Sequence, residues 1–264
     1  MIDGLLIGGK GNIGSGLRTY LPKLDADYRL TSVDLPGAED KATDSDAQAD
    51  FVEADITADD ARLRELLEGR DLVVYLAFTK DLGIMNAMTD QVFRAILDVC
   101  PDAMVVGSSS VHATGAVYTP FDKEPYKTIA AREFDKLEQW PDPIPATQRP
   151  WMWADYGIQK AYVETWCQRL GANGHSAVAA RWGGINAKNQ MREETAYFSV
   201  WCHQEDAARF VDSCYKAHVN GSLVTGAHYY VISNNTYNIF DIETPKREIG
   251  YEPTWDAEMF YSDK

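Results

Sequence analysis

The stretch Ile2-Asp3-Gly4-Leu5-Leu6-Ile7-Gly8-Gly9-Lys10-Gly11-Asn12-Ile13-Gly14 decides the fold. Residues 2–7 form a short apolar strand pattern, glycines follow at three-residue intervals, and a helix-like stretch then runs from Ile13 to Leu21. Glycine lets the backbone turn tightly and approach a pyrophosphate, and the N-terminus of the next helix offers free N–H groups and a positive dipole end. Because the glycines lie between a strand and a helix, they predict a dinucleotide site. The expected cofactor-binding residues of this loop are Gly8, Gly11, Asn12, Ile13 and Gly14.

An acidic residue follows the glycines at the distance that a ribose contact requires. Asp34 closes the strand-like segment 28–33, about twenty residues after Gly14. A carboxylate there accepts hydrogen bonds from the adenosine ribose hydroxyls and repels a 2′-phosphate, although a turn-forming role before Leu35 is the alternative. Lys10 pulls mildly toward a phosphorylated cofactor, but no basic residue stands beside Asp34. The sequence therefore favours NAD.

Strand and helix patterns alternate along the chain. An expected strand at 50–53 precedes Asp55 and Ile56, a buried-strand pattern ends at Ala77, and a further strand leads into three serines at 108–110. This alternation predicts an α/β fold with a Rossmann-type doubly wound parallel sheet, in which ligands bind at the carboxyl ends of the strands. We expect one domain over 1–264 with a small C-terminal substrate-binding region, and substrate-side elements at about 119–150 and 184–264.

Composition excludes several classes of partner and site. The formal net charge of −15 argues against nonspecific binding of nucleic acid or of an anionic membrane. No apolar run approaches the ~18–20 residues that span a bilayer, so we expect a cytoplasmic protein without a membrane anchor. The four cysteines lack metal-site spacing and are expected to be buried free thiols; no metal is expected.

Tyr156-Gly157-Ile158-Gln159-Lys160 carries the expected chemistry. Residues four apart share one face of a helix, so Tyr156 and Lys160 would be neighbours. A cation within ~4–6 Å lowers the pKa of a phenol and makes it a usable base near neutral pH. An ordinary surface helix can also carry a tyrosine and a lysine at this spacing. The rest of the sequence is therefore needed to distinguish a catalytic pair from a surface pair.

A proline-rich segment interrupts the α/β pattern at 119–150. It contains Pro120 and five further prolines, and a short charged helix is expected at about 130–139. Excursions of this length inside an α/β domain are usually functional or disordered. Trp140, Trp151 and Trp153 favour an ordered loop packed on the rest of the protein, where it would close over a substrate as a lid.

The motifs occur in an order that resembles the extended short-chain dehydrogenase/reductases. The ordered set comprises the glycine loop, Asp34, Asp55-Ile56, Ser110, Tyr156-x-x-x-Lys160 and His203-x-x-Asp206. Within that superfamily the chain is most similar to uronate dehydrogenases and their short relatives, through Ser109-Ser110-Val111-His112, Arg181-x-Gly183, Arg192 and Gly250-Tyr251-x-Pro253.

The resemblance implies NAD-dependent oxidation of a sugar or sugar acid. It implies Ser110, Tyr156 and Lys160 as catalytic residues, with Lys160 also on the cofactor, and His112 and Arg192 beside the substrate. Lys80 stands where a substrate-contacting serine is expected, which adds a second cation and predicts an anionic sugar, either a uronate or a sugar phosphate. Related enzymes pair helices corresponding to about 85–99 and 155–170, so a homodimer or a multiple of one is expected.

Departures from the pattern leave the substrate open. Val111 replaces an asparagine, Gly184 replaces a serine, and Thr89 stands near the place of another asparagine. Three alternatives remain: an NAD-dependent sugar-phosphate dehydrogenase, a nucleotide-sugar epimerase and a non-catalytic dinucleotide-sensing regulator. The epimerase usually has a larger C-terminal half, and the regulator has no need of Ser110, Tyr156 and Lys160 together.

Overall fold

The computed structural model describes residues 1–24, 26–44, 47–119 and 121–261, so Pro120 lies outside the described residues. The strands are β1 Ile2–Ile7, β2 Tyr28–Asp34, β3 Asp50–Glu53, β4 Leu72–Tyr75, β5 Met104–Ser110, β6 Ala177–Trp182 and β7 His228–Val231. The helices are α1 Asn12–Tyr20, α2 Asp60–Leu67, α3 Leu82–Val99, α4 Tyr126–Ala130, α5 Asp155–Ala172, α6 Tyr197–Val200, α7 Gln204–Val219 and α8 Glu243–Ile249. The 3₁₀ helices are η1 Leu21–Lys23, η2 Val111–Val117, η3 Phe134–Lys136 and η4 Ala257–Phe260.

The described strands form one parallel sheet in the order β3-β2-β1-β4-β5-β6-β7. The chain steps outward from β1 to β3, then returns to β4 beside β1 and proceeds to the other edge. This reversal is the strand order of a doubly wound Rossmann sheet, and it confirms the predicted fold class. β4, β5 and β6 are buried along their whole length, because helices cover both faces of the sheet.

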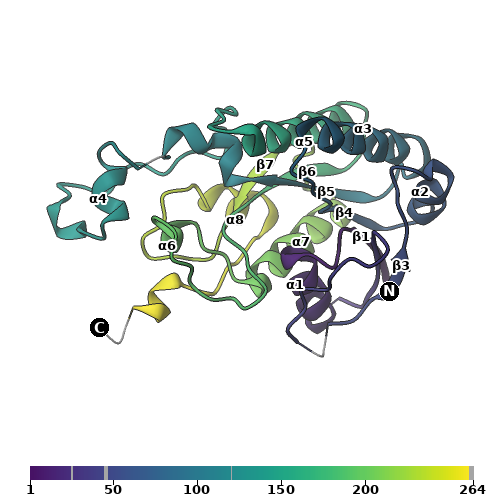
Figure 1. Ribbon diagram of the computed structural model, residues 1–264, viewed down its shortest axis with the longest axis horizontal. Helices are drawn as coiled ribbons and strands as arrows, with labels where there is room; N and C mark the ends of the chain where they lie inside the picture. The colour runs from purple at the N-terminus through teal and green to yellow at the C-terminus, as the bar shows by residue number, and fades with distance from the viewer. Residues whose placement is uncertain (25, 45–46, 120, 262–264) are drawn as a thin grey trace.

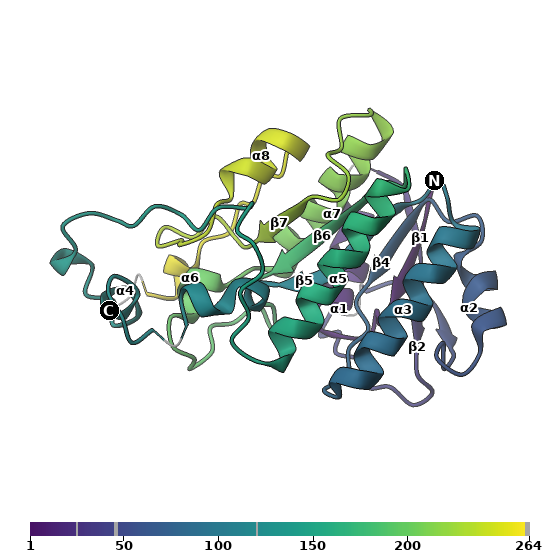
Figure 2. The ribbon, with the colours of Figure 1, turned by 90° about the horizontal axis from the view of Figure 1, so that it is seen from above.

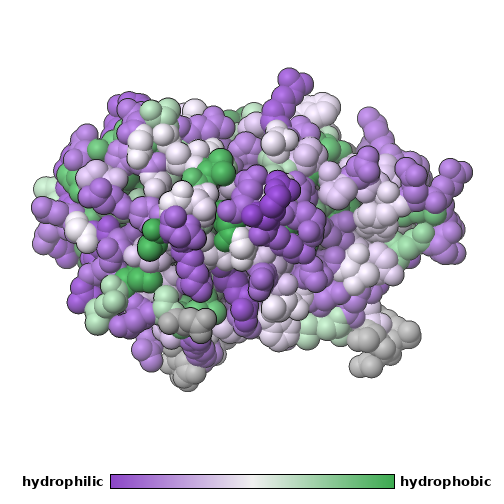
Figure 3. Space-filling model, turned by 180° about the vertical axis from the view of Figure 1, so that it is seen from behind, coloured by the Kyte–Doolittle hydropathy of each residue, from purple (hydrophilic) through white to green (hydrophobic). Residues whose placement is uncertain are grey.

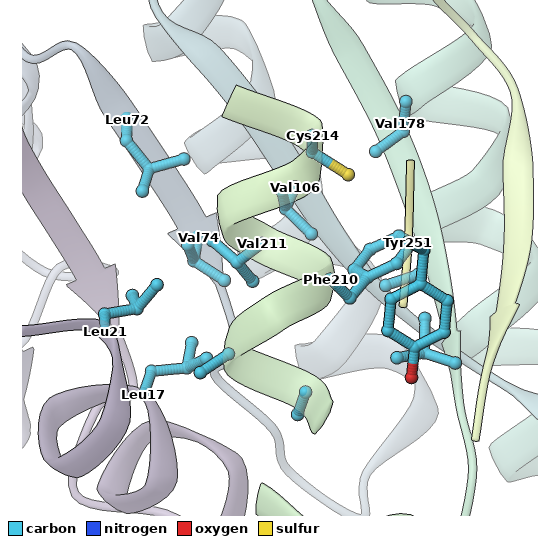
Figure 4. Packing of buried hydrophobic residues seen from close by; sticks show 14 of the residues in the cluster. Leu17, Leu21, Leu72, Val74, Val106, Val178, Phe210, Val211, Cys214 and Tyr251 are labelled. Carbon is cyan, nitrogen blue, oxygen red and sulfur yellow. The ribbon is translucent and has the colours of Figure 1, made fainter. Parts of the chain in front are cut away.

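Helices α2, α3 and α5 cover one face of the sheet, and α1 and α7 cover the other (Figures 1 and 2). On the second face, Phe210, Val211 and Cys214 of α7 belong to one buried cluster with Val106 of β5 and Leu17 of α1 (Figure 4). Capping residues fix where the helices start: His203 accepts a hydrogen bond from the backbone N–H of Glu205 at the first turn of α7.

A third apolar cluster lies beyond the carboxyl ends of β5, β6 and β7. It joins residues of η2, the segment 119–150, α6 and the C-terminal region, among them Tyr118, Ile144, Phe198 and Phe240. Ile144 forms an isolated parallel bridge with Phe240, and the ring of Phe134 stacks on Tyr237 with 3.6 Å between centroids. The segment 119–150 is therefore packed, as predicted, and Trp140 packs on Phe134 and Tyr237, whereas Trp151 and Trp153 are exposed.

The charged helix expected at 130–139 is wrong. Helix α4 ends at Ala130, and Arg132 takes a left-handed backbone with φ 56°. The Arg132 guanidinium makes a bidentate ion pair with Glu258 and lies over the ring of Tyr261. These contacts with the C-terminal region outweigh the local helix preference of a charged stretch.

Candidate active site

The glycine loop joins β1 to α1 and packs tightly against the strands beside it. Gly8 has φ 91°, and a Cβ there would lie 2.7 Å from the backbone nitrogen of Ala77. A Cβ on Gly14 would lie 2.4 Å from Gly9, so this glycine lets α1 approach the loop. Gly11 differs, since its Cβ would meet only one atom, at 3.4 Å. The first turn of α1 has no side-chain cap, which leaves its N-terminus available to a ligand.

A cavity of about 510 Å³ opens between this loop and the ends of β2 and β4. We call it the loop cavity. Its lining includes six of the predicted cofactor residues, Gly8, Gly11, Asp34, Asp55, Ile56 and Ala77, together with their neighbours Lys10 and Met88. Its position at the point where the strand order reverses is where α/β sheets bind their ligands.

Asp34 faces the loop cavity with part of its carboxylate already used. It accepts hydrogen bonds from the backbone N–H of Lys10 at 3.2 Å and from the Ser32 hydroxyl at 2.8 Å. Burial raises the pKa of Asp34, and these bonds act in the opposite direction. The Lys10 ammonium lies 3.5 Å from Glu53. Lys10, the cation that would favour a cofactor with a 2′-phosphate, is thus paired with the Glu53 carboxylate.

A smaller cavity of about 290 Å³ adjoins the loop cavity, and we call it the central cavity. Gly8, Gly11, Leu76 and Phe78 line both. The central cavity also brings together residues from α1, β5, α5 and the end of β6: Asn12, Ile13, Gly14, Ser108, Tyr156, Lys160, Trp182 and Gly183. Every predicted residue of the glycine loop therefore lines one cavity or the other.

Lys160 is buried beneath the central cavity. Only 3% of its surface is exposed, and its ammonium donates a hydrogen bond of 3.0 Å to the carbonyl oxygen of Ser108. The same nitrogen lies 5.5 Å from the ring centroids of Tyr156 and Phe78. Burial lowers the pKa of Lys160 to about 8.

Tyr156 lies in the wall between the central cavity and a third one. The ring of Tyr156 packs edge-on against Phe78 and His112, at centroid distances of 5.4 and 5.6 Å. Burial raises the pKa of Tyr156, and a hydrogen bond with Ser110 lowers it in part. The expected lowering by Lys160 is not found, because the ammonium bonds to the Ser108 carbonyl instead of the phenol.

The third cavity, here the inner cavity, measures about 510 Å³ and lies on the far side of Tyr156. The two cavities share Tyr156, Gly183 and Ile185. The predicted residues Ser110, His112 and Arg192 line the inner cavity, and so does Trp153. Its other lining residues include several that the sequence did not single out: Tyr118, Thr119, Phe121, Glu194, Thr195 and Tyr197.

The solved structures similar to this chain share its whole fold. A glucuronic acid dehydrogenase from Chromohalobacter salexigens is 18% identical with a TM-score of 0.72, covering 100% of this chain and 88% of that one. A uronate dehydrogenase from Agrobacterium tumefaciens is 17% identical with a TM-score of 0.70, covering 99% and 87%. A dTDP-glucose 4,6-dehydratase from Bacillus anthracis, in complex with NAD, is 12% identical with a TM-score of 0.69, covering 100% and 98%.

The chain shares its fold with these uronate and glucuronic acid dehydrogenases and with the dTDP-glucose 4,6-dehydratase. No protein-family profile and no curated protein sequence matches it. Within the described residues, no helix is long and apolar enough to cross a membrane. The same residues contain no cluster of histidine, cysteine or acidic side chains that could hold a metal ion.

Ser110 ends β5 and points its hydroxyl at the start of η2. Its oxygen accepts a hydrogen bond of 3.2 Å from the backbone N–H of His112 and donates one of 3.4 Å to the carbonyl of Trp182. The serines were expected just after a strand, whereas they are its last three residues. Their position at the carboxyl end of the sheet follows the prediction.

The cations predicted beside the substrate are not both in the inner cavity. Arg192 lines it, 3.4 Å from the Glu194 carboxylate, which also lines it. Lys80 is exposed and lines none of the described cavities, because the loop after β4 turns it outward while Gln159 holds its carbonyl. The structure thus does not bring Lys80 to Arg192, and an acid, Glu194, accompanies Arg192 instead.

Gly184 shows why this site departs from the family pattern. A Cβ at Gly184 would lie 2.4 Å from the ring of Tyr197, so a serine does not fit unless Tyr197 moves. The Tyr197 hydroxyl accepts a hydrogen bond of 3.2 Å from Asn186. Neither Tyr197 nor Glu194 belongs to a motif, although Glu194 follows Arg192 by two residues.

Proposed function

We propose that the protein is an NAD-dependent dehydrogenase that oxidises a sugar acid at a carbinol carbon. The observation that carries the proposal is the place of Tyr156 between the central and inner cavities, with Ser110 and the buried Lys160 beside it. The general base in the oxidation of an alcohol must reach the substrate hydroxyl while the carbinol carbon faces the cofactor. Tyr156 stands at that boundary.

NAD would lie along the loop and central cavities. The uncapped N-terminus of α1 and the open face of Gly11 fit a pyrophosphate, and Asp34 fits the adenosine ribose. Lys160, under the central cavity, would hold the nicotinamide ribose. When bound, NAD supplies the acceptor for a hydride.

The chain's own residues would manage the proton. Tyr156 takes the proton of the substrate hydroxyl, and Ser110 hydrogen-bonds the same oxygen. To favour the phenolate in the substrate complex, the ammonium of Lys160, 5.5 Å from the Tyr156 ring centroid, would have to turn from the Ser108 carbonyl toward the phenol. His112, packed against the same ring, would contact a neighbouring hydroxyl of the sugar.

A uronate suits the inner cavity better than a sugar phosphate does. Arg192 offers a planar fork for one carboxylate, and Glu194 beside it opposes the higher charge of a phosphate. The second cation on which the phosphate alternative depended, Lys80, does not line the cavity. The similar structures named for uronate and glucuronic acid dehydrogenases agree with this choice.

A panel of uronates, neutral aldoses and sugar phosphates, followed by NADH absorbance, tests the reaction. A uronate should give the highest kcat/KM. Tyr156→Phe should lower turnover by at least ~10²-fold, the low end for general acid–base catalysis, while NAD affinity holds. Near wild-type turnover of this variant would remove Tyr156 from the mechanism, and a neutral aldose used as well as any uronate would make Arg192 structural.

Asp34 should set the preference for NAD over NADP. Asp34→Asn keeps an acceptor for the Lys10 N–H but removes the charge that repels a 2′-phosphate. The ratio of kcat/KM for NAD to that for NADP should fall by about tenfold or more in Asp34→Asn and in Asp34→Ala. A wild-type preference for NADP would overturn the role assigned to Asp34. If the NAD-to-NADP ratio fell in Asp34→Ala but not in Asp34→Asn, the shape of the loop, and not the charge of Asp34, would determine the choice of cofactor.

A further inference from the structure

Three consecutive large apolar residues lie exposed just before α5. Trp151, Met152 and Trp153 have 57%, 37% and 64% of their surfaces accessible. The sequence grouped Trp151 and Trp153 with Trp140, but Trp140 packs on Phe134 and Tyr237 and is separate from them. Contiguous exposed apolar side chains are unfavourable in water and mark surfaces that bind something.

The exposed tryptophans are held in a fixed position. The backbone N–H of Trp151 donates to the Ala113 carbonyl at 2.8 Å, and the Trp151 carbonyl accepts from Ala116 at 2.9 Å. Just upstream, the buried Arg181 guanidinium donates to the Gln148 carbonyl at 2.8 Å. An exposed surface that is fixed on both sides loses little conformational entropy when a ligand binds.

Trp151, Met152 and Trp153 line a fourth cavity, of about 470 Å³, which we call the outer cavity. The other described residues that line it come from η2 and the start of the 119–150 segment: Ala116, Val117, Tyr118, Thr119, Asp122, Lys123 and Tyr126. It shares Tyr118, Thr119 and Trp153 with the inner cavity. The outer cavity therefore adjoins the inner cavity, in which we place the substrate.

The shared wall contains a polar group without a partner. Tyr118 is 4% exposed, and its hydroxyl makes no hydrogen bond within the described part of the chain. Burial raises the pKa of Tyr118, with Tyr230 and Tyr156 acting in the same direction, so the hydroxyl stays protonated and can donate. A buried hydroxyl left unpaired is unfavourable, but this oxygen is closed off from the cavities, so a ligand oxygen would pair with it only after the Tyr118 ring moved.

We propose that the outer cavity is a second sugar subsite and that the preferred substrate carries a second sugar ring. This inference rests on the proposed function. The reacting ring occupies the inner cavity, and the second ring lies against Trp151 and Trp153. Aromatic faces pack on the apolar C–H face of a pyranose, while Thr119, Asp122 and Lys123 meet its hydroxyls.

The reaction itself is unchanged by the second ring. One carbinol C–H of the reacting ring leaves as hydride to NAD, its hydroxyl proton goes to Tyr156, and the carbon becomes a carbonyl. The glycosidic bond is neither formed nor broken. The second ring contributes binding free energy at a distance from the reacting carbon.

Paired substrates test the subsite: galacturonate against digalacturonate, and glucose against cellobiose, each with NAD. At least one disaccharide should have a kcat/KM about tenfold or more above that of its single ring. Trp151 lines only the outer cavity, so Trp151→Ala should bring this ratio close to one. Val219→Ala, an exposed apolar change at the end of α7, should leave the ratio as in the wild type. Single rings used as well as their disaccharides in both pairs would overturn the subsite.

Calorimetric titration of digalacturonate in the presence of NADH separates the subsite from the reaction. Tight binding that weakens about tenfold or more in Trp151→Ala, without oxidation of any sugar, would support the subsite and refute the proposed function. Oxidation of galacturonate with no gain in affinity for digalacturonate would do the reverse. A loss of molecular mass by light scattering in Trp151→Ala would show that a second copy covers these tryptophans, and would overturn the subsite.

Discussion

Lys160 lies beside Tyr156, and its burial in that position destabilises the folded protein while the ammonium is charged. The i,i+4 spacing predicted that it would neighbour Tyr156, and the helix places it so. The spacing could not reveal the direction of the shift in the Tyr156 pKa, because that shift depends on burial beside Phe78 and His112. Phe78 comes from the loop after β4 and His112 from η2. Local sequence predicts which side chains are adjacent; the solvation of the pair comes from tertiary packing.

Replacing Lys160 should stabilise the protein in a pH-dependent way. Its pKa falls from 10.5 unfolded to about 8 folded, so below pH 8 the folded state holds a charge that burial disfavours. Lys160→Met should raise the free energy of unfolding at pH 7, by an amount on the order of 3 kcal/mol at most. The gain should shrink between pH 8 and 10.5, where the folded wild type is already neutral.

Urea denaturation at pH 7 and pH 10 measures this difference. Lys80→Met, at an exposed lysine, is the matched control and should show no such change with pH. A Lys160→Met variant that is less stable than the wild type at pH 7 would contradict the assigned burial penalty.

At the scale of elements, β6 and α5 are joined by a buried ion pair that also holds the 119–150 segment. Arg181 of β6 contacts Glu164 of α5 at 2.8 and 2.9 Å, and both side chains are buried. The remaining donors of Arg181 reach the carbonyls of Ala146 and Gln148. Most of the segment is thus anchored to the sheet and to the C-terminal region, and Thr119 and Phe121 are its described residues that reach the inner cavity.

Removing one partner of this pair should destabilise the protein and loosen the segment. Glu164→Gln leaves the Arg181 charge buried without a counter-ion and should lower the free energy of unfolding by about 3–5 kcal/mol. Hydrogen exchange should quicken around 144–151, where the carbonyls lose their fixed donor. The double variant Glu164→Leu/Arg181→Met should lose less free energy of unfolding than the sum of the losses in the single variants Glu164→Leu and Arg181→Met. Additive losses would mean that the two side chains act independently.

The extent of the elements was largely predictable, and the exceptions have a common cause. The apolar runs of β1, β4 and β5 and the start of α7 follow from buried-strand patterns and caps. The segment 119–150 did not follow its local pattern, because contacts with the C-terminal residues 237–261 determine its path. Such contacts join parts of the chain about a hundred residues apart and leave no local signature.

At the scale of the whole molecule, α3 and α5 lie side by side on one face of the sheet (Figure 2). Tyr162 and Trp166 of α5 both donate to Asp90 of α3, which fixes the two helices as one surface. The side of the molecule behind the view of Figure 1 is mainly hydrophilic with small separate apolar patches (Figure 3). The paired helices remain our candidate for a two-fold interface.

The protein should be a dimer or a multiple of one at micromolar concentration. Light scattering should give at least twice the chain mass of 29.5 kDa. Thr165→Arg, on the exposed side of α5, should reduce the mass to that of a monomer, whereas Ser222→Arg, after α7, should not. A wild-type monomer would end the prediction, and dissociation by Ser222→Arg would place the interface elsewhere.

The loop cavity and the inner cavity are lined by different parts of the chain. The described residues that line the loop cavity lie between Ile7 and Met88, and those that line the inner cavity lie between Ser110 and Val200. A recombination crossover between Met88 and Ser110 would therefore exchange the nucleotide specificity of the loop cavity and leave the sugar specificity of the inner cavity unchanged. Chimeras cut within the second half of α3 could inherit a new nucleotide preference from one parent and a sugar preference from the other. In such hybrids, residues of α3 and α5 would come from different parents, so the packing between these two helices would have to be restored.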